Sequence, residues 1–160
     1  MSIWWSLHLR REAASVPLAR RLLLGTMETA GVDPDISYDL SVALGEACAN
    51  AVEHGGGQDS GDASAAYRVT AYLDGEKCRI EVADSGPGFP VPDSGFAVRH
   101  GEKCPYSVPQ ASPTAESGRG LCLIEQLADH VDFRNRPGHG AVVSFDKTLK
   151  WRENALLKVS

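Results

Sequence analysis

The sequence predicts a two-layer α/β sandwich, in which three helices pack on one face of a mixed, mainly antiparallel sheet. Apolar and polar residues alternate with the period of a strand near the N-terminus, in the middle and near the C-terminus. Short turns interrupt the second and third of these stretches and predict hairpins. Helical periodicity fills the intervals between them, and this grouping is typical of helices layered on a sheet.

Length and composition indicate one globular domain over residues 1–160. The chain has 160 residues, of which 42% are hydrophobic and 23% charged, and no apolar run approaches the roughly 18 residues of a membrane span. The N-terminal residues also lack the basic and then apolar regions of a secretion signal. We therefore expect a cytoplasmic protein that does not contact a membrane.

The charge and the cysteines exclude two further classes of function. A formal net charge of -5 argues against direct, sequence-independent binding to nucleic acid, which needs clustered Lys and Arg. The cysteines include no Cys-x-x-Cys pair and no histidine at the spacing of a zinc site; they are Cys48, Cys78, Cys104 and Cys122. We expect reduced thiols that pack as small hydrophobic side chains.

The first elements are a strand and two helices. Residues 3–9 alternate apolar and polar side chains and predict the strand. The first helix is expected to begin near Val16 and to end before Gly31, because its apolar residues recur at helical spacing. The second helix, 34–54, has the clearest signals: Asp33 as N-cap, a proline at its first position and glycines after its end.

The remaining elements follow a polar loop. Residues 67–73 and 77–83 flank the turn Asp-Gly-Glu and predict an antiparallel hairpin. No periodicity is evident from 84 to 117, where Pro and Gly recur, so we expect a mobile lid over about 89–117 instead of regular structure. A helix of about three turns is predicted next, and two alternating strands around the turn Arg-Pro-Gly-His-Gly close the chain.

The second helix carries polar residues at four-residue spacing in a stretch that is otherwise small and apolar. At 100° per residue, Glu46, Asn50 and His54 run along the border of the apolar face. Polar groups held there lose water and need a partner, either within the protein or in a ligand with a metal ion. An Asn carbonyl suits a hard cation such as Mg²⁺, and a carboxylate one turn away could polarise a hydroxyl. Taken alone, these residues fit best with a helix edge whose polar groups are satisfied internally.

Two glycine-containing segments downstream suggest a binding site. Asp84 follows a strand and could accept a hydrogen bond from an exocyclic amine, and Gly86 and Gly88 leave room for a flat group, although these residue types also suit a plain turn. Residues 117–121, Ser-Gly-Arg-Gly-Leu, open a helix. Their backbone N–H groups and Arg119 suit a phosphate, although a Ser N-cap followed by flexible glycines accounts for the same pattern.

The order of these segments resembles a known superfamily. Glu-x-x-x-Asn on a helix, Asp-x-Gly-x-Gly after a strand, a Pro/Gly-rich lid and Gly-x-Gly-Leu at a helix start are similar to the N, G1 and G2 boxes of the ATPases that include DNA gyrase B, the Hsp90 chaperone, histidine kinases and MutL. The resemblance covers nearly the whole chain and implies their Bergerat-type ATP-binding fold. The small stand-alone branch, the bacterial anti-sigma factor serine/threonine kinases, fits best. Only 39 residues follow Leu121, too few for the second domain of the gyrase-like members. A histidine kinase needs a phospho-acceptor His before the N box, and the first helix carries no His.

The resemblance implies a role for each residue of the boxes. Glu46 would be the general base that takes the proton from a substrate hydroxyl, and Asn50 would bind the Mg²⁺ on the ATP phosphates. Asp84 would accept from the adenine amino group, with Gly86 and Gly88 giving the base room. The phosphates would be lined by the G2 box, namely Gly118, Arg119, Gly120 and Leu121.

Two departures from the family pattern bear on ATP binding. A Thr that supports the adenine-binding Asp often follows the last glycine of the terminal hairpin, and Ala141 stands there in this chain. An Arg that serves the γ-phosphate in sporulation-type members is replaced by Glu116, and Arg119 is close enough in sequence to compensate. His54 ends the N box in many relatives and is expected to be structural.

The resemblance therefore implies an anti-sigma factor that sequesters a sigma factor and uses Mg-ATP to phosphorylate a Ser or Thr on a STAS-type antagonist. The alternative is a nucleotide-dependent module that binds its partner without phosphotransfer. An unrelated α/β domain with accidental motifs would bind no nucleotide. A homodimer that pairs an exposed edge strand, such as residues 3–9, is a further expectation.

Overall fold

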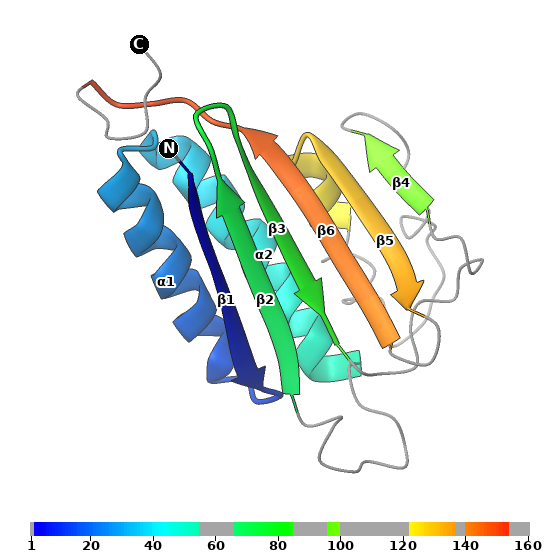
Figure 1. The fold of residues 1–160 in the computed structure, drawn as a ribbon. Helices are drawn as coiled ribbons and strands as arrows, with labels where there is room; N and C mark the ends of the chain where they lie inside the picture. Colours follow the sequence, from blue (N-terminus) through cyan, green and yellow to red (C-terminus); the bar gives the residue numbers. More distant parts are fainter. Residues whose placement is uncertain (1, 55–65, 85–95, 100–121, 137–139, 154–160) are drawn as a thin grey trace.

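A computed structural model describes residues 2–54, 66–84, 96–99, 122–136 and 140–153. One six-stranded sheet, in the order β1-β2-β3-β6-β5-β4, has helices packed against one of its faces, which confirms the predicted sandwich (Figure 1). In chain order the elements are β1 (Ile3–Arg10), α1 (Ser15–Ala30), α2 (Pro34–His54), β2 (Ala66–Leu73), β3 (Lys77–Ala83), β4 (Phe96–Arg99), β5 (His130–Arg136) and β6 (Gly140–Thr148). Residues 122–127 form a further helical segment before β5.

Every pairing between the described strands is antiparallel, so the predicted mixed sheet is wrong in that detail. The connection between β1 and β2 contains two helices. α1 returns the chain along the sheet and α2 carries it back again, so that β2 enters beside β1 in the opposite direction (Figure 1). A single crossover helix would have made the two strands parallel.

The segment from 84 to 117, which was expected to lack regular structure, contains one short strand. β4 pairs antiparallel with β5, with Phe96 opposite Phe133 and Arg99 opposite His130. A strand of four residues is too short to show a reliable sequence period, and its partner comes much later in the chain. The rest of the predicted lid lies outside the described residues.

The helical segment before β5 ends where its apolar period ends, at Leu127 and Ala128. Its last described turn is closed by the bond from the Ala128 N–H to the Ile124 carbonyl, 2.9 Å. The next residue, Asp129, already belongs to the sheet edge, because its N–H donates to the Asp146 carbonyl at 2.9 Å and its Oδ2 accepts from the Thr148 N–H at 2.6 Å. These bonds to β6 compete with a further helical turn.

The turn between α1 and α2 is built as the sequence predicts. Gly31 adopts a φ of 90° and its N–H donates to the Met27 and Glu28 carbonyls, which ends α1. Asp33 then caps α2, since its Oδ1 accepts from the Asp35 N–H at 2.8 Å. The two helices therefore pack side by side as an antiparallel pair.

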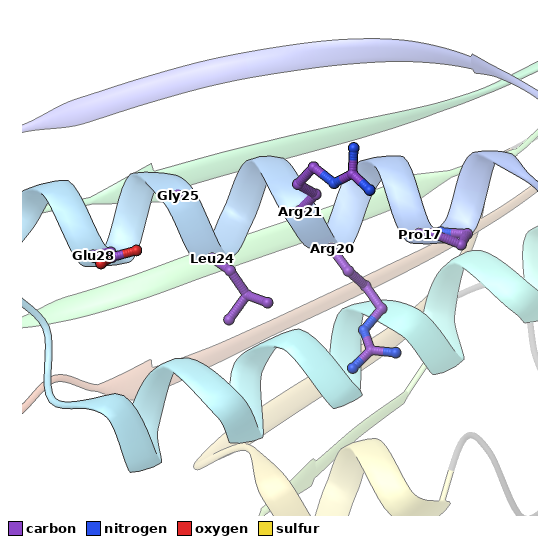
Figure 2. A pocket seen from close by; sticks show the side chains of 6 residues that line it. All are labelled: Pro17, Arg20, Arg21, Leu24, Gly25 and Glu28. Atoms are coloured by element: carbon purple, nitrogen blue, oxygen red, sulfur yellow. The ribbon is translucent and has the colours of Figure 1, made fainter.

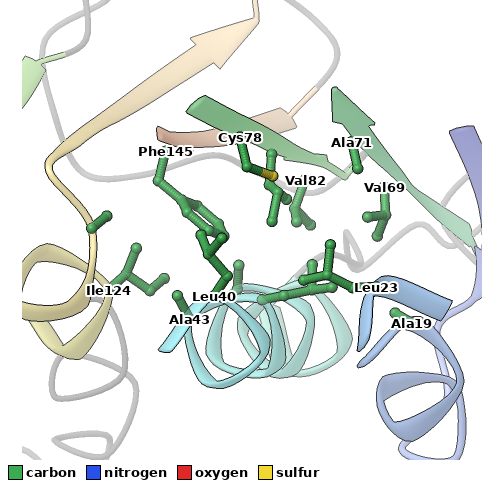
Figure 3. Packing of buried hydrophobic residues seen from close by; sticks show 14 of the residues in the cluster. Ala19, Leu23, Leu40, Ala43, Val69, Ala71, Cys78, Val82, Ile124 and Phe145 are labelled. Carbon is green, nitrogen blue, oxygen red and sulfur yellow. The ribbon is translucent and has the colours of Figure 1, made fainter. Parts of the chain in front are cut away.

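The core lies between the helices and the sheet (Figure 3). Leu23 of α1 and Leu40 of α2 face Val69 and Val82 of the sheet, and Phe145 fills the space toward Ile124. All of these side chains are buried. β2 and β3 contribute alternate residues, as the period of 2 predicts.

A buried polar network joins α1, α2 and β2. The Ser15 hydroxyl donates to the Glu12 carbonyl at 2.7 Å and lies 2.5 Å from the Tyr67 hydroxyl. Tyr67 also hydrogen-bonds the Cys48 side chain. Burial raises the pKa of the Cys48 thiol to about 12, an effect that the Tyr67 hydrogen bond opposes in part. The three elements are thus linked at one buried point.

The cysteines differ in their chemistry. Cys48 and Cys78 are free and buried, as predicted. Cys122 is disulfide-bonded, so the expectation of a reduced thiol is wrong for this residue. Because Cys48 and Cys78 are free, its partner lies outside the described residues. Sequence spacing could not reveal this bond, since a disulfide depends on which cysteines lie within a few ångströms in space.

Among the described residues, no helix is both long and apolar enough to cross a bilayer.

Leu23→Ala should lower the free energy of unfolding by about 3 kcal/mol, because Leu23 is fully buried and its truncation leaves a cavity under the sheet. Leu24→Ala, one residue on and 38% exposed, should cost less than about 0.5 kcal/mol. Urea denaturation of the two variants measures the difference. Equal losses would contradict the described orientation of α1.

The Cys48 thiol predicts a loss of stability at alkaline pH. In the unfolded chain it ionises near 9.0, and in the folded chain near 12. Between these values the unfolded state binds fewer protons, so the free energy of unfolding falls as pH rises, by up to about 1.4 kcal/mol per pH unit for this group. Urea titrations of wild type and Cys48→Ala at several pH values from 8 to 11 measure the slope. The variant should show the shallower fall, and equal slopes would refute the assignment.

Candidate functional site

α2 places Glu46 and Asn50 at the border of its buried face. The two residues are four apart and therefore lie one above the other on the same side of the helix. Both are half-buried, as the helical period predicts. The face beside them consists of side chains that are at most 1% exposed, namely Leu40, Ala43, Leu44, Ala47 and Ala51.

The residue midway in sequence between these two helps the buried face to hold the rotation of α2. Cys48 is fully buried and hydrogen-bonded to Tyr67 of β2. Turning the helix far enough to bury Glu46 or to expose it fully would break this bond and move Cys48 toward solvent. The amide and the carboxylate are therefore held half-exposed, where they can meet a ligand while staying positioned by the core.

Asp84 is fixed at the end of β3 by a reciprocal pair of hydrogen bonds with Ala141 of β6. Its N–H donates to the Ala141 carbonyl at 2.9 Å, and its Oδ1 accepts from the Ala141 N–H at 3.1 Å. Asp84 is 8% exposed, so the carboxylate is oriented in a nearly dry setting. The backbone of Ala141 thus supports Asp84 at the position where the family pattern has a Thr hydroxyl.

Gly140 makes this arrangement possible. Its φ of 95° lies in the left-handed region, which a residue with a side chain adopts only at a cost. β6 begins at this residue, so Ala141 is its second residue and is aligned with β3. The pairing of Ala83 with Val142 continues the ladder from the Asp84 bonds.

The N-box residues and Asp84 belong to elements that touch. α2 packs against β3, and the C-terminal half of α2 and the end of β3 lie at the same end of the sandwich (Figure 1). The structure therefore places two of the three sequence segments, the N box and the Asp of the G1 box, on adjoining elements. The other predicted residues, Gly86, Gly88, Glu116, Gly118, Arg119, Gly120 and Leu121, lie outside the described residues, as does the side chain of His54.

A close contact between α1 and α2 was not identified from the sequence. A Cβ on Gly45 would lie 3.0 Å from Cδ of Arg20, so the missing side chain leaves room for the Arg20 stem across α2. The Arg20 Nε is buried and has no hydrogen-bond partner among the described residues. A glycine inside a strong helix, next to Glu46, was the signal that could have indicated this packing.

A shallow groove of about 420 Å³ lies along α1, where Arg20 reaches toward α2 (Figure 2). Its lining consists of Pro17, Arg20, Arg21, Leu24, Gly25 and Glu28. None of the residues that the sequence singled out for nucleotide binding lines it. The groove is therefore separate from the site at the end of β3.

The atoms that the site offers to a ligand or a metal ion are side-chain oxygens. A carboxylate from Glu46, an amide from Asn50 and a carboxylate from Asp84 provide a proton acceptor, a neutral hard ligand and a hydrogen-bond acceptor. Within the described ranges no cluster of three or more His, Cys, Asp or Glu could hold a metal ion unaided. A hard cation shared with the oxygens of a bound phosphate fits this donor set.

Comparisons with known proteins found relatives that cover most of the chain. The serine-protein kinase RsbW of Bacillus licheniformis is 33% identical over 135 residues, which cover 84% of this chain and 78% of that protein. RsbW of Bacillus subtilis is 30% identical over 84% of this chain and 86% of its own length, and RsbW of Listeria monocytogenes is 32% identical over 87% and 84%.

The fold is also similar to a solved structure, that of the RsbU and RsbW domains of Rv1364c from Mycobacterium tuberculosis. The TM-score is 0.62 at 20% identity, over 98% of this chain, which spans about a third (35%) of that structure's length. Residues 9–147 match the histidine kinase-like ATPase domain. These findings confirm the resemblance drawn from the motifs: the chain belongs to the histidine kinase-like ATPase domain family.

Proposed function

We propose that this protein is an ATP-dependent protein serine/threonine kinase and an anti-sigma factor of the cytoplasm. It binds Mg-ATP, sequesters a sigma factor and phosphorylates a STAS-type antagonist. The observation that carries the proposal is the fixed pair Glu46 and Asn50 on α2, packed against the strand that ends in the backbone-anchored Asp84. Relatives named serine-protein kinase, at 30% to 33% identity over most of the chain, support the reaction type.

Asp84 selects the nucleotide base. Its Oδ1 is committed to the Ala141 N–H, which orients the carboxylate as an acceptor. An exocyclic amine, as on adenine, matches an acceptor, whereas the carbonyl at the same position of guanine would face a carboxylate with no proton between them. Gly86 and Gly88 give the base room in this proposal.

Glu46 and Asn50 act on the transferred phosphoryl group. A carboxylate oxygen of Glu46 takes the proton of the substrate hydroxyl. The hydroxyl oxygen bonds to the γ-phosphorus as the bond between this phosphorus and the ADP oxygen breaks. The amide oxygen of Asn50 is a ligand for Mg²⁺, which when bound offsets the negative charge of the phosphates. Gly118, Arg119, Gly120 and Leu121 line the phosphates in this proposal, and the residues of about 89–117 that lie outside β4 close over them as a lid.

The partners follow from the reaction. Phosphorylation adds charge to the antagonist and would weaken its contact with the kinase, which frees the kinase to hold a sigma factor. The alternative, a nucleotide-dependent module without phosphotransfer, rests on the two departures from the family pattern, Ala141 and Glu116. The kinase assay below separates the two.

Glu46→Gln should lower the rate of phosphotransfer to the antagonist by 10²- to 10⁴-fold, because the amide cannot take the hydroxyl proton. ATP affinity should stay within about threefold, since Glu46 acts on the second substrate. Labelled ATP measures transfer and calorimetry measures binding.

The matched control is Glu53→Gln, which removes an exposed carboxylate from the same helix and should leave transfer unchanged. Transfer by Glu46→Gln at the wild-type rate would refute the assignment of the base. ATP binding by the wild type without transfer to its antagonist would establish the alternative module.

Asp84→Asn should weaken ATP binding by about 10- to 100-fold and reduce the preference for ATP over GTP. The Ala141 N–H needs an acceptor, so the new amide oxygen stays there and the NH₂ group is turned toward the base, donor against donor. Guanine offers an acceptor at that position and loses less. Asp132→Asn, at a surface ion pair on β5, is the control and should bind ATP normally. An unchanged ATP to GTP ratio would contradict the role of Asp84.

A further inference from the structure

The sheet has one face that no described helix covers. In Figure 1 the helices α1 and α2 lie behind the strands, so the viewer looks onto this uncovered face. Along β2 and β3 the residues that point to it alternate with the buried core residues. An antiparallel sheet commonly exposes one face to water, where hydroxyl pairs and pairs of opposite charge stabilise it. The part of the uncovered face on β1, β2 and β3 departs from that pattern.

Two aromatic side chains lie next to each other on this part of the face. Trp4 of β1 is directly opposite Tyr72 of β2, and residues directly opposite in an antiparallel pair point to the same side of the sheet. Trp4 is 65% exposed and Tyr72 is 38% exposed. Large apolar side chains that are grouped on a surface mark a site of contact with another molecule.

Two arginines flank the aromatic rings and have no acidic partner. Arg79 of β3 is directly opposite Tyr72, and Arg68 lies four residues before Tyr72 on the same side of β2. Asp146 of β6 is directly opposite Arg79, but its Oδ1 is hydrogen-bonded to Nδ1 of His130 at 2.9 Å. Within the described part of the chain, neither arginine forms an ion pair. Their guanidinium groups can therefore bind carboxylates of another molecule.

The charge of this part of the face is opposite to the charge of the whole chain. The residues of β1, β2 and β3 that point to the uncovered face include one acid, Glu81, and four cations, namely Arg10, Arg68, Lys77 and Arg79. The chain as a whole has a formal net charge of -5. Charge complementarity therefore favours an acidic partner at this surface.

The residue types favour a protein segment as that partner. Trp, Tyr and Arg are enriched among the residues that contribute most of the binding energy at protein interfaces. Nucleic acid would be repelled by the acidic remainder of the chain and by Glu81 on the same surface. A second copy of this face would place its own arginines against Arg68 and Arg79, which is unfavourable.

The size of the surface suits a short extended segment. Three strands span about 15 Å with their side chains, and the distance from Trp4 to Arg10 along β1 is about 20 Å. The resulting area of about 300 Å² is less than half of the roughly 800 Å² that each partner contributes to a standard interface. An extended segment of about six to eight residues covers this length.

The register of the strands indicates which side chains the segment needs. An extended segment that lies along β2 points every second side chain toward the sheet. An apolar side chain would pack on Trp4 and Tyr72, and an acidic side chain four residues further would reach Arg68, about 13 Å along the strand. The position midway between them is level with Glu81 of β3, so it excludes an acid and accepts a neutral side chain.

We propose that the uncovered face of the sheet binds a short, extended, acidic segment of a protein partner. The apolar side chain of the segment packs on Trp4 and Tyr72, and its carboxylates bind Arg68 and Arg79. Asp84 of the proposed nucleotide site is at the other end of β3 from Arg79, so this docking surface can be tested separately from the proposed kinase activity.

The test uses a fluorescein-labelled peptide, Gly-Glu-Asp-Leu-Ser-Thr-Ser-Asp-Glu-Gly, whose leucine and second aspartate are four residues apart. Fluorescence anisotropy with the full-length protein in about 0.1 M salt should give saturable binding with a Kd below about 100 µM. Trp4→Ala should weaken this binding at least about 10-fold, and so should the double variant Arg68→Glu with Arg79→Glu. Circular dichroism and urea midpoints check that the variants are folded.

The matched control is Arg134→Glu, which reverses the charge of an arginine on the same face of the sheet. Arg134 lies on β5, where it is paired with Asp132 at 3.7 Å. Its row of directly opposite residues also contains Arg68, three strands and about 14 Å away, which exceeds the Debye length of about 10 Å at 0.1 M salt. Peptide binding by this variant should stay within about twofold of the wild type.

A second peptide tests the register. Replacing the threonine of the probe by glutamate should weaken binding about five- to tenfold, and Glu81→Gln should remove that difference. Four results would each overturn the proposal: no peptide binding by the wild type at about 100 µM protein, equal binding by the Trp4 and double arginine variants, an equal loss in Arg134→Glu, or no discrimination between the two peptides. Tighter binding of a labelled polyuridine oligonucleotide of about twelve nucleotides would assign the surface to nucleic acid instead.

Discussion

The packing of α2 against the centre of the sheet is the constraint on which the other features depend. Its buried face is narrow and rich in alanine, so the helix lies close to β3. The hydrogen bond between Cys48 and Tyr67 helps this face to hold the rotation of the helix. With the helix held in this way, Glu46 and Asn50 stay at the border of the core, partly exposed. If the helix could rotate, one of these two side chains would become buried or both would become fully exposed, and the site would lose its geometry.

The second support of the site is made by backbone and not by side chains. Asp84 and Ala141 exchange two hydrogen bonds where β3 ends and β6 begins. Because a backbone N–H is present whatever the side chain, the loss of the family's Thr at this position does not leave the carboxylate without support. The departure from the family pattern therefore leaves the position of Asp84 intact. The arrangement instead requires a glycine at position 140, because the φ there is 95°.

Periodicity and end signals predicted most of the elements, because each depends on neighbouring residues. The bounds of α2 follow from Asp33 and from the glycines after His54, and the hairpin of β2 and β3 follows from alternation on both sides of a short turn. β4 was missed because four residues that pair with a distant strand carry no local period. The disulfide of Cys122 was missed for a related reason, since the spacing of cysteines along the sequence does not show which of them lie close together in the folded chain.

The sequence alone determined the fold class, the border position of Glu46 and Asn50, and the order of the segments proposed to bind nucleotide, because these depend on residue type and spacing along the chain. Tertiary structure alone decided two further features: the wholly antiparallel pairing of the described strands and the support of Asp84 by the Ala141 backbone. Each of these joins residues that are far apart in sequence, and only the folded chain brings their atoms within hydrogen-bonding or packing distance.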